Sequence, residues 1–493
     1  SGNLSWRDYV SRVARSAGML HRLGLRPGER YAILSRNSVW HAELLLAGYW
    51  AGMVPVPLNF RLAPAEIAAM LDDAACRVLF VEDHFLPMLA QPALAPWKSR
   101  AVLIGGTTGN ATAMPFTDAL RADAEVMPAR EADQNDDALL LYTGGTTGRG
   151  KGVRLSHRNI VTNALQLSRI MTAGEDDIYL HVSPMFHSTD LKATVVSMFG
   201  GGHVYLREFS PAAVLEAIER YGITIASLVP TMIIRILKEA EVGRYDLRRL
   251  RLISYGTAPM DEQWLRKAMQ AFPQTGFHQC YGLTETSPYL AILDEESHRR
   301  ALDDRPGLLR AAGRLLPGTA ARIVGHDGTV LGEGAIGELA VSGPQVSNGY
   351  LNRPEEQAQA YRGGWFYTGD IARIDGDGYL HILDRKKEMV ITGGENVYTR
   401  EVETVLLQHP AVAEAAVVGV PDAQYGEALL AVLVPGKTGP VDGSELIAFC
   451  RSHLGGYKIP RRFVFVEQLP RTPLGKIRKH ELRAAYLEGG GER

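Results

Sequence analysis

The strongest constraint on the fold of this chain is a loop rich in glycine and threonine that follows an apolar run, residues 139–142. The loop has the sequence Thr143-Gly144-Gly145-Thr146-Thr147-Gly148-Arg149-Gly150-Lys151. Glycine lets backbone N–H groups approach a ligand closely, threonine adds hydroxyl donors and lysine adds a point charge. Together these groups can hold a polyphosphate, although loops of this composition are also ordinary surface linkers.

A P-loop is the competing interpretation, because Gly145 to Lys151 fits its G-x-x-x-x-G-K pattern. The next residue is Gly152, however, where a P-loop needs a serine or threonine hydroxyl for magnesium. Residues 153–156 then alternate apolar and polar side chains like a strand, whereas a P-loop needs a helix N-terminus there. The sequence therefore argues against a P-loop kinase or ATPase.

Further segments appear in a fixed order along the chain. They are Tyr281-Gly282-Leu283-Thr284-Glu285-Thr286, Gly363-Gly364-Trp365-Phe366-Tyr367-Thr368-Gly369-Asp370, Asp384-Arg385-Lys386-Lys387-Glu388, Gly393-Gly394-Glu395-Asn396 and Pro473-Leu474-Gly475-Lys476-Ile477. With the glycine–threonine loop, this set resembles the adenylate-forming superfamily, which contains acyl-CoA and aryl-CoA synthetases, luciferases and peptide-synthetase adenylation domains. The resemblance runs from about Ser5 to Arg483.

Charge and cysteine usage exclude several other classes. Lysine and arginine total 53 against 55 aspartate and glutamate, a net charge of −2, so no basic excess points to nucleic acid or a lipid surface. No apolar stretch reaches the roughly 18 residues that span a bilayer, and no signal peptide is visible. The three cysteines, Cys76, Cys280 and Cys450, have no metal-ligand spacing, and their odd number argues against a disulfide framework. We expect a cytoplasmic protein without membrane insertion.

Helices and strands alternate in the first part of the chain, which predicts a layered α/β fold. Helical periodicity covers residues 4–23 and 41–51, and strand-like runs cover 30–35 and 54–58. Shorter strands near 307–349 suggest a small β-barrel-like part. The predicted domains are 1–384, which binds ATP and acid, and 385–493, a small mobile α+β domain with Thr399 as a helix cap and the catalytic lysine.

The resemblance implies roles for the nucleotide-binding segments. Residues Thr143 to Lys151 would grip pyrophosphate, with Gly144 and Gly150 where the commonest pattern has serine and proline. Glu285 and Thr146 would bind Mg²⁺, which suits hard oxygen donors. Tyr281 would stack on adenine beside Gly282 and Thr284, with Gly256-Thr257-Ala258-Pro259 on the other side.

The resemblance also implies roles for the later segments. Asp370 would accept both ribose hydroxyls, since a carboxylate has two acceptor oxygens, and Arg385 would be a second ribose or phosphate contact. Lys476 would bridge the substrate carboxylate and the α-phosphate. Lys387 lies where the family keeps its hinge, and Gly393-Gly394 would approach the pantetheine of coenzyme A.

The acid pocket implied by the resemblance has few diagnostic residues. Its expected lining is His187, Ser188, Val229, Thr231, Tyr255, Cys280 and Gly282. His187 either gates this pocket or is a satisfied structural residue, and Cys280 should narrow it. Asp190 and Lys192 stand where many relatives have small or apolar residues; they can pair, meet a polar group of the acid or face solvent, and solvent is slightly preferred.

The sequence thus predicts an ATP-dependent acyl-CoA or aryl-CoA synthetase that uses Mg²⁺ and coenzyme A. It would form an acyl-adenylate and pyrophosphate, then a thioester and AMP. No phosphopantetheine attachment domain follows Lys476, which favours free coenzyme A. The alternatives are an enzyme that loads a carrier protein, a luciferase-like oxidase and a non-catalytic nucleotide-binding protein. The particular acid stays open, and a homodimer is one option for the oligomeric state.

Overall fold

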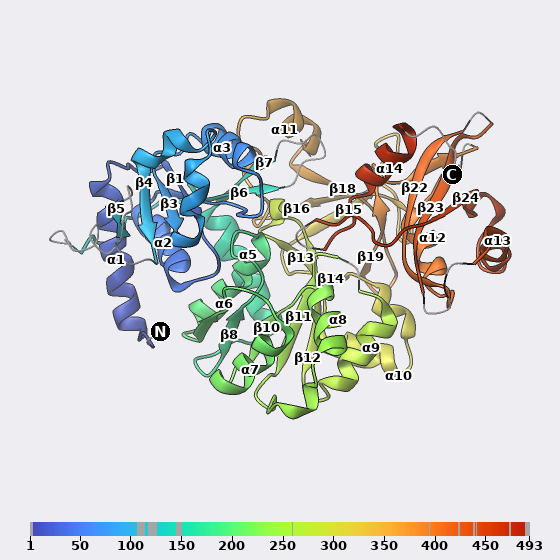
Figure 1. Ribbon diagram of the computed structural model, residues 1–493, viewed down its shortest axis with the longest axis horizontal. Coiled ribbons are helices and arrows are strands. Elements are labelled where there is room, and N and C mark those ends of the chain that lie inside the picture. Colours follow the sequence, from blue (N-terminus) through green and yellow to red (C-terminus); the bar gives the residue numbers. More distant parts are fainter. Residues whose placement is uncertain are drawn as a thin grey trace. The chain divides into compact units, whose positions relative to one another are not determined.

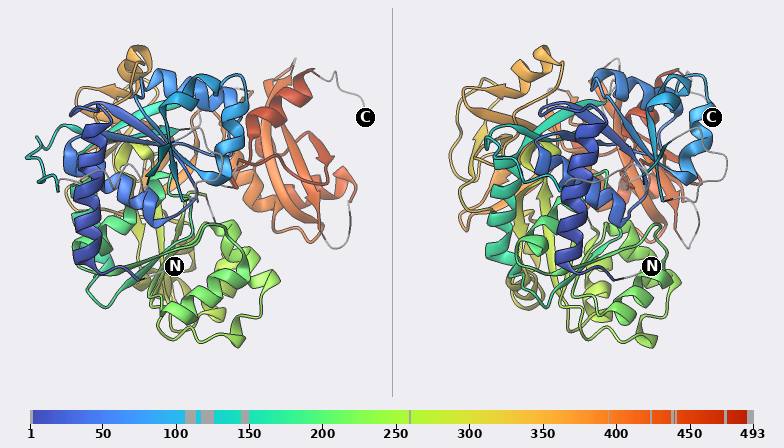
Figure 2. Two further views of the ribbon diagram at one scale, coloured as in Figure 1. Left: turned by 60° about the vertical axis from the view of Figure 1, so that its left-hand side comes forward. Right: turned by 90° about the vertical axis from the view of Figure 1, so that its left-hand side faces the viewer.

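The computed structural model divides the chain into two compact units (Figures 1 and 2). Unit 1 comprises residues 1–320 and 342–366, and unit 2 comprises residues 321–341 and 367–493. The structure describes residues 3–105, 114–116, 126–143, 150–258, 260–393, 395–422, 424–436, 439, 441–472 and 475–488.

Unit 1 begins with a five-stranded sheet in the order β2-β1-β3-β4-β5, whose neighbouring strands are parallel. Its elements are α1 (Trp6–Arg22), β1 (Arg30–Leu34), α2 (Val39–Ala51), β2 (Val54–Pro57), α3 (Pro64–Asp73), β3 (Leu79–Glu82), the 3₁₀ helices η1 (Asp83–Ala90) and η2 (Ala95–Arg100), β4 (Ala101–Ile104) and β5 (Met114–Pro115). Helix α1, dark blue in Figure 2, packs along α2.

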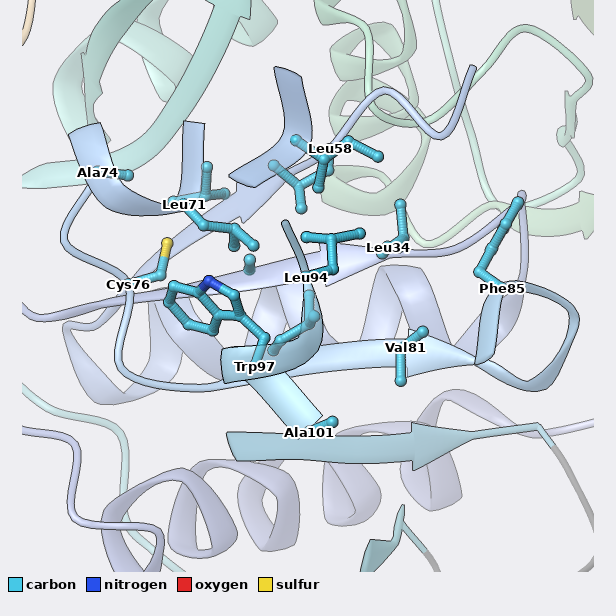
Figure 3. Close-up of a cluster of buried hydrophobic side chains, with 14 of the residues drawn as sticks. Leu34, Leu58, Leu71, Ala74, Cys76, Val81, Phe85, Leu94, Trp97 and Ala101 are labelled. Carbon is cyan, nitrogen blue, oxygen red and sulfur yellow. The ribbon is translucent and has the colours of Figure 1, made fainter. Parts of the chain in front are cut away.

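Successive side chains of β1 point to opposite faces of this sheet, and each face has an apolar core. Tyr31 and Ile33 pack on the face that includes Ala47 of α2. Ala32 and Leu34 pack on the other face, in the cluster with Leu71 and Trp97 that Figure 3 draws. Covering both faces explains why the strands of this sheet are apolar throughout.

The second part of unit 1 contains a larger sheet in the order β14-β13-β12-β11-β10-β8-β9. Its elements are β8 (Ile178–His181), η3 (Ser188–Lys192), α6 (Ala193–Met198), β9 (Gly202–Tyr205), α7 (Pro211–Tyr221), β10 (Ile225–Ser227), α8 (Pro230–Glu239), η4 (Val242–Arg244), β11 (Leu252–Gly256), α9 (Glu262–Ala271), β12 (Gly276–Gly282), η5 (Thr284–Thr286), β13 (Tyr289–Leu293), α10 (Glu295–Asp303), η6 (Pro306–Arg310) and β14 (Gly313–Leu315). Strands β8 to β12 pair in parallel, and α7, α8 and α9 lie side by side (Figure 1). The carboxyl ends of these parallel strands therefore share one edge, where α/β sheets commonly bind ligands.

A hairpin leads into this second part of unit 1. Strands β6 (Asp137–Thr143) and β7 (Lys151–Ser156) pair antiparallel, and α5 (His157–Met171) follows. Unit 1 also contains α11 (Pro354–Ala360) and β17 (Tyr361–Arg362). Because a strand follows the glycine–threonine loop, the prediction against a P-loop is confirmed.

Unit 2 contains two groups of strands. The first group, in the order β15-β16-β18-β19, has β15 (Ala320–Val324), β16 (Gly337–Ser342), β18 (Trp365–Ile374) and β19 (Tyr379–Arg385). Strands β15 and β16 fall in the stretch near 307–349 where the sequence predicts a β-rich part. The second group, β21-β20-β23-β22 with β24 beside β23, has β20 (Val390–Thr392), β21 (Glu395–Val397), α12 (Thr399–Leu406), β22 (Val412–Asp422), β23 (Gly426–Pro435), α13 (Gly443–Arg451), η7 (Gly456–Lys458), β24 (Arg462–Phe465) and α14 (Lys479–Glu488).

Helices cover both faces of the C-terminal sheet. Ala415 and Val417 of β22 pack in one core with Val402 of α12, while Ala416 and Val418 pack in a second core with Leu482 of α14. Unit 2 is thus a mixed α/β body with cores of its own, which agrees with the predicted small C-terminal domain. The domain boundary predicted between residues 384 and 385 stays a prediction.

Most local predictions are confirmed to within a few residues, including α1, α2, β1 and β2. Thr399 is an exception, because it is the first helical residue and Tyr398 holds the cap position. The side chain of Asp384 supplies the missing cap by accepting the N–H of Thr399. The three cysteines are free and buried. No helix in the described part of the chain combines the length and apolar character needed to cross a bilayer.

Candidate active site

The base of the glycine–threonine loop is the end of the β6–β7 hairpin. Thr143 pairs with Lys151 in register, and the Thr143 hydroxyl donates to the Lys151 carbonyl at 3.4 Å. The Lys151 ammonium lies 5.0 Å from the ring centroid of Tyr350, a cation–π distance. The hairpin therefore fixes Lys151 at the loop mouth with an aromatic ring behind it.

Glu285 lies in η5 and is 8% exposed. The Tyr350 hydroxyl donates to Glu285 Oε1 at 2.8 Å, and the Ser347 N–H donates to the Glu285 carbonyl at 2.8 Å. Burial, and then the Glu285 charge, raise the pKa of Tyr350, so this hydroxyl stays a donor. Lys151, Tyr350 and Glu285 consequently form one continuous run from the loop mouth to the expected magnesium ligand.

Glycine is required at two positions of the expected nucleotide site. A Cβ at Gly256 would lie 2.2 Å from the Cys280 carbonyl oxygen, and one at Gly282 would lie 1.9 Å from the Pro288 carbonyl oxygen. Thr257 has a positive φ of 67°, and its buried hydroxyl has no hydrogen-bond partner among the described residues. Such an orphaned hydroxyl next to a crowded backbone is consistent with a ligand that supplies the partner.

Tyr281 follows on β12 and is half-buried, while Ala258 lies in the bend after β11. Thr284 begins η5, and its hydroxyl lies 3.2 Å from the hydroxyl of Ser188. These residues gather at the carboxyl ends of β11 and β12. Gly144, Gly145, Thr146, Thr147, Gly148, Pro259 and Gly394 lie outside the described residues, so their predicted roles stay predictions.

The residues expected around the acid are brought together only in part. Ser188 and Cys280 are buried on one side of the sheet, and Val229 caps α8, whose first turn contains half-buried Thr231. Tyr255 pairs with Gln279 and not with Cys280, and its hydroxyl lies 2.9 Å from His298 Nε2. The Tyr255 side chain therefore points to the opposite face of the sheet from Cys280.

His187 precedes η3 and caps it. Its Nδ1 accepts the Thr189 N–H at 3.3 Å and is also bonded to the Thr189 hydroxyl. This contact gives Nδ1 a structural use, one of the two roles that the sequence allowed. Gating of the acid would have to involve the rest of the ring.

The slight preference for solvent exposure of Asp190 and Lys192 is wrong, since Asp190 is 7% and Lys192 1% exposed. They do not pair with each other. Asp190 lies 3.0 Å from His181 Nδ1, while the Lys192 ammonium donates to Cys280 Sγ at 3.2 Å. Burial occurs because η3 turns down onto β12 and β13, a long-range contact that the local sequence does not encode.

In unit 2, Asp370 and Arg385 face each other across the β18–β19 pair. Arg385 Nε lies 2.8 Å from Asp370 Oδ1, and Asp370 is 2% exposed. A carboxylate has two acceptor oxygens, which is the chemistry that a cis-diol contact needs. The pair is therefore compatible with the diol contact expected from the sequence.

Lys476 lies on an exposed turn of unit 2. Its N–H donates to the Thr472 hydroxyl at 3.1 Å, and its carbonyl accepts the Thr472 N–H at 2.7 Å. Arg471 reinforces this turn by donating to the Gly475 carbonyl at 2.7 Å. These bonds define the position of the Lys476 backbone.

Lys387 belongs to a turn directly after β19. Lys386 N–H donates to the Gly369 carbonyl at 2.9 Å, and Glu388 N–H donates to the Arg385 carbonyl at 2.9 Å. Gly393 is at the β20–β21 turn with a positive φ of 59°, and its N–H donates to the Tyr425 carbonyl at 2.9 Å. Both segments thus have turn geometry.

The sequence missed the shell around Glu285. Tyr350 is 65 residues from Glu285 along the chain, and Ser347 lies 2.6 Å from Tyr361 through their hydroxyls. Nothing local links these tyrosines to a carboxylate. No cluster of three His, Cys, Asp or Glu side chains that could hold a metal occurs in the part of the chain that the structure describes. A single carboxylate fits Mg²⁺ that takes its remaining ligands from phosphate and water.

Comparison with known proteins identifies the family of this chain. Residues 1–351 match the AMP-binding enzyme family, and residues 401–476 match the AMP-binding enzyme C-terminal domain. A feruloyl-CoA synthase from Amycolatopsis sp is 37% identical over 98% of this chain and 94% of the relative. A fatty acid–[acyl-carrier-protein] ligase from Streptomyces coeruleorubidus is 36% identical over 96% of this chain and 89% of its own length.

A solved structure of similar fold is ATP-bound MatB from Rhodopseudomonas palustris, with a TM-score of 0.88 and 33% identity over 99% of this chain and 94% of that one. The fold and the nucleotide-site geometry define an adenylate-forming enzyme. The chain belongs to the AMP-binding enzyme family, in the branch of the superfamily that contains the acyl-CoA and aryl-CoA ligases.

Proposed function

We propose that this protein is an ATP-dependent acid–thiol ligase that converts a carboxylic acid into its coenzyme A thioester through an acyl-adenylate. The observation that carries the proposal is the run of Lys151, Tyr350 and Glu285 beside the glycine–threonine loop. It offers a cation for phosphate oxygens and a buried carboxylate for a divalent ion within one unit. The family and its coenzyme A ligases supply the context.

In the first step, a carboxylate oxygen of the acid attacks the α-phosphorus of ATP. The bond from that phosphorus to the bridging oxygen breaks, and pyrophosphate leaves with its electron pair. Mg²⁺ would neutralise phosphate charge, with Glu285 and Thr146 as its protein ligands. Lys476 would stabilise the oxygens that gain charge in the transition state.

In the second step, a thiol attacks the acyl carbonyl and AMP leaves. Lys387 would be the hinge that exchanges Lys476 for the Gly393–Gly394 turn between the two steps. We propose free coenzyme A as the thiol. A carrier protein is the second candidate, because one relative is named as an acyl-carrier-protein ligase.

The test is pyrophosphate release from ATP with a broad panel of acids, in three arms: coenzyme A, a holo carrier protein or no thiol. Coenzyme A ligase activity predicts AMP, pyrophosphate and an acyl-CoA in the first arm. Cleavage of ATP to ADP and phosphate would contradict the proposal. If a thioester forms on the carrier protein alone, the carrier protein is the acceptor and not coenzyme A. Turnover that needs oxygen but no thiol would indicate an oxidase.

A cytoplasmic location is part of this proposal and is supported by the three free cysteines. A homodimer also stays a prediction from the sequence, which sedimentation of the purified chain can check.

A further inference from the structure

Lys192 is buried without a carboxylate partner. Its side chain is 1% exposed, its ammonium donates to Cys280 Sγ at 3.2 Å, and it lies 4.7 Å from the ring centroid of Tyr289. An ammonium has three N–H donors and a thiol is only a weak acceptor. No carboxylate forms an ion pair with Lys192 in the described ranges, and Asp190, two residues earlier, is held by His181.

A histidine close to Lys192 also has an unsatisfied ring nitrogen. His278 is on the same face of β12 as Cys280, and its buried Nδ1 has no hydrogen-bond partner among the described residues. Burial, and then the Lys192 charge, lower the pKa of His278 to about 3, so this ring is neutral. A neutral histidine gives an ammonium no counter-charge.

The position of Lys192 relative to the reacting end follows from three contacts of η3. The Ser188 hydroxyl meets Thr284 at 3.2 Å, the Thr189 carbonyl accepts the Tyr289 hydroxyl at 2.8 Å, and Lys192 reaches Cys280. Thus η3 runs from Thr284, beside Glu285, down along β12. Cys280 is two residues before Gly282, a distance of about 6.5 Å along a strand. Lys192 therefore marks the inner end of the expected acid pocket.

A structural role explains this lysine poorly. Burying an ammonium without a counter-charge costs several kcal/mol, and a methionine would fill the same apolar surroundings without that penalty. Ion pairing is the usual reason for a buried lysine, but Lys192 forms no ion pair with any residue that the structure describes. A ligand oxygen that replaces the missing acceptor would explain both the lysine and the unsatisfied His278 nitrogen beside it.

We propose that Lys192 is a specificity-determining residue, and that the acid this enzyme activates has an acceptor oxygen, either a hydroxyl or a second carboxylate, at the end remote from its reacting carboxylate. This inference rests on the proposed function. The Lys192 ammonium donates to that remote oxygen, and Cys280 and Tyr289 flank it.

The experiment compares matched acids with the wild-type enzyme, ATP and coenzyme A. One pair is para-hydroxycinnamic and para-methylcinnamic acid, and the other is adipic and hexanoic acid. We expect kcat/KM to be higher for the oxygen-bearing member of at least one pair by tenfold or more, as for a hydrogen bond to a charged group. Lys192→Met should abolish that preference, mainly by lowering kcat/KM for the oxygen-bearing acid.

The matched control is Lys267→Met, which removes an exposed lysine of α9 in the same unit and should keep the preference. A second variant, Lys192→Gln, keeps a donor and should retain part of the preference. It serves as the test if Lys192→Met proves poorly folded. Equal turnover of both members of each pair by the wild type, or an unchanged preference in a folded Lys192→Met variant, would overturn the inference. Absence of acyl-adenylate with every acid would instead remove the proposed function itself.

Discussion

Lys192 in unit 1 and Lys479 in unit 2 are both withdrawn from water, but their surroundings differ. Lys479 lies 2.7 Å from Glu403 Oε1 and 3.6 Å from Glu388 Oε2, and its ammonium donates to the Thr399 hydroxyl at 2.7 Å. Burial lowers the pKa of Lys479, but the charges of Glu403, Asp384 and Glu388 outweigh it and the pKa is raised. Among the described residues, Lys192 contacts the Cys280 thiol and the Tyr289 ring, and burial lowers its pKa.

The difference separates a structural lysine from one that requires another explanation. The Lys479 network joins α14 to α12 and to the turn after β19, so its charges are satisfied by the fold itself. It also fixes the two segments on which the proposed chemistry depends, Lys476 before α14 and Lys387 beside Glu388. Around Lys192, the residues that the structure describes supply no corresponding carboxylate.

The largest expected effect is on Lys476, which lies three residues before Lys479 on the turn whose backbone bonds to Thr472. Lys476→Ala should lower the rate of adenylate formation about a thousandfold, because it removes a charge aimed at the developing oxyanions. Pyrophosphate exchange measures this rate. Thermal unfolding should be unchanged, since the side chain is exposed. A loss of stability with normal pyrophosphate exchange would instead assign Lys476 a structural role.

The next effect concerns the turn beside the Lys479 network. Lys387→Pro fixes φ and removes an N–H within the proposed hinge. We expect thioester formation from preformed acyl-adenylate to fall by more than about tenfold, while pyrophosphate exchange stays within about twofold. Lys387→Ala is the control and should behave like the wild type in both assays. Equal loss of both half-reactions in the proline variant would refute the hinge.

The Lys479 network itself should be costly to break. Lys479→Met removes the cation that pairs with Glu403, and among the described residues the Arg400 guanidinium remains to face Glu403 and Asp384. We therefore expect a loss of about 2 kcal/mol in the free energy of unfolding. Denaturant unfolding measures this loss. Replacing Glu403 as well, by leucine, should recover part of it. His480→Ala, an exposed neighbour in α14, should have little effect and serves as the control.

The sequence could predict what depends on local pattern. Periodicity located α1 and α2, and the strand after Lys151 excluded a P-loop. It could not predict the partners of Glu285, because Tyr350 and Ser347 reach it through chain reversal far along the sequence. Lys192 was noticed as unusual but was expected in water, since a lysine in a short polar run usually lies at the surface. Its burial depends on β12 and β13, and Asp384 likewise caps α12 from another element.

At Lys192 we expect the free energy of unfolding to change in the opposite direction. Lys192→Met removes a buried charge that has no counter-ion, so the ligand-free variant should be more stable than the wild type by about 1 kcal/mol at neutral pH. Denaturant unfolding in parallel with Lys479→Met makes the comparison direct. A large loss of stability in Lys192→Met would place Lys192 in the same structural class as Lys479 and weaken the specificity argument.

The smallest effect is the pH dependence of that gain. The folded pKa of Lys192 is lowered from 10.5, and the groups that face it are Cys280, His278 and Tyr289. Below the folded pKa the lysine is charged in both states, so the folded wild type bears the full penalty of a buried charge. As pH rises through the folded pKa towards 10.5, the unfolded chain binds more protons, and wild-type stability rises relative to the variant. The stability difference in favour of Lys192→Met should therefore shrink between neutral pH and about pH 10. A constant difference would mean that another group of the protein already satisfies the ammonium when no ligand is bound.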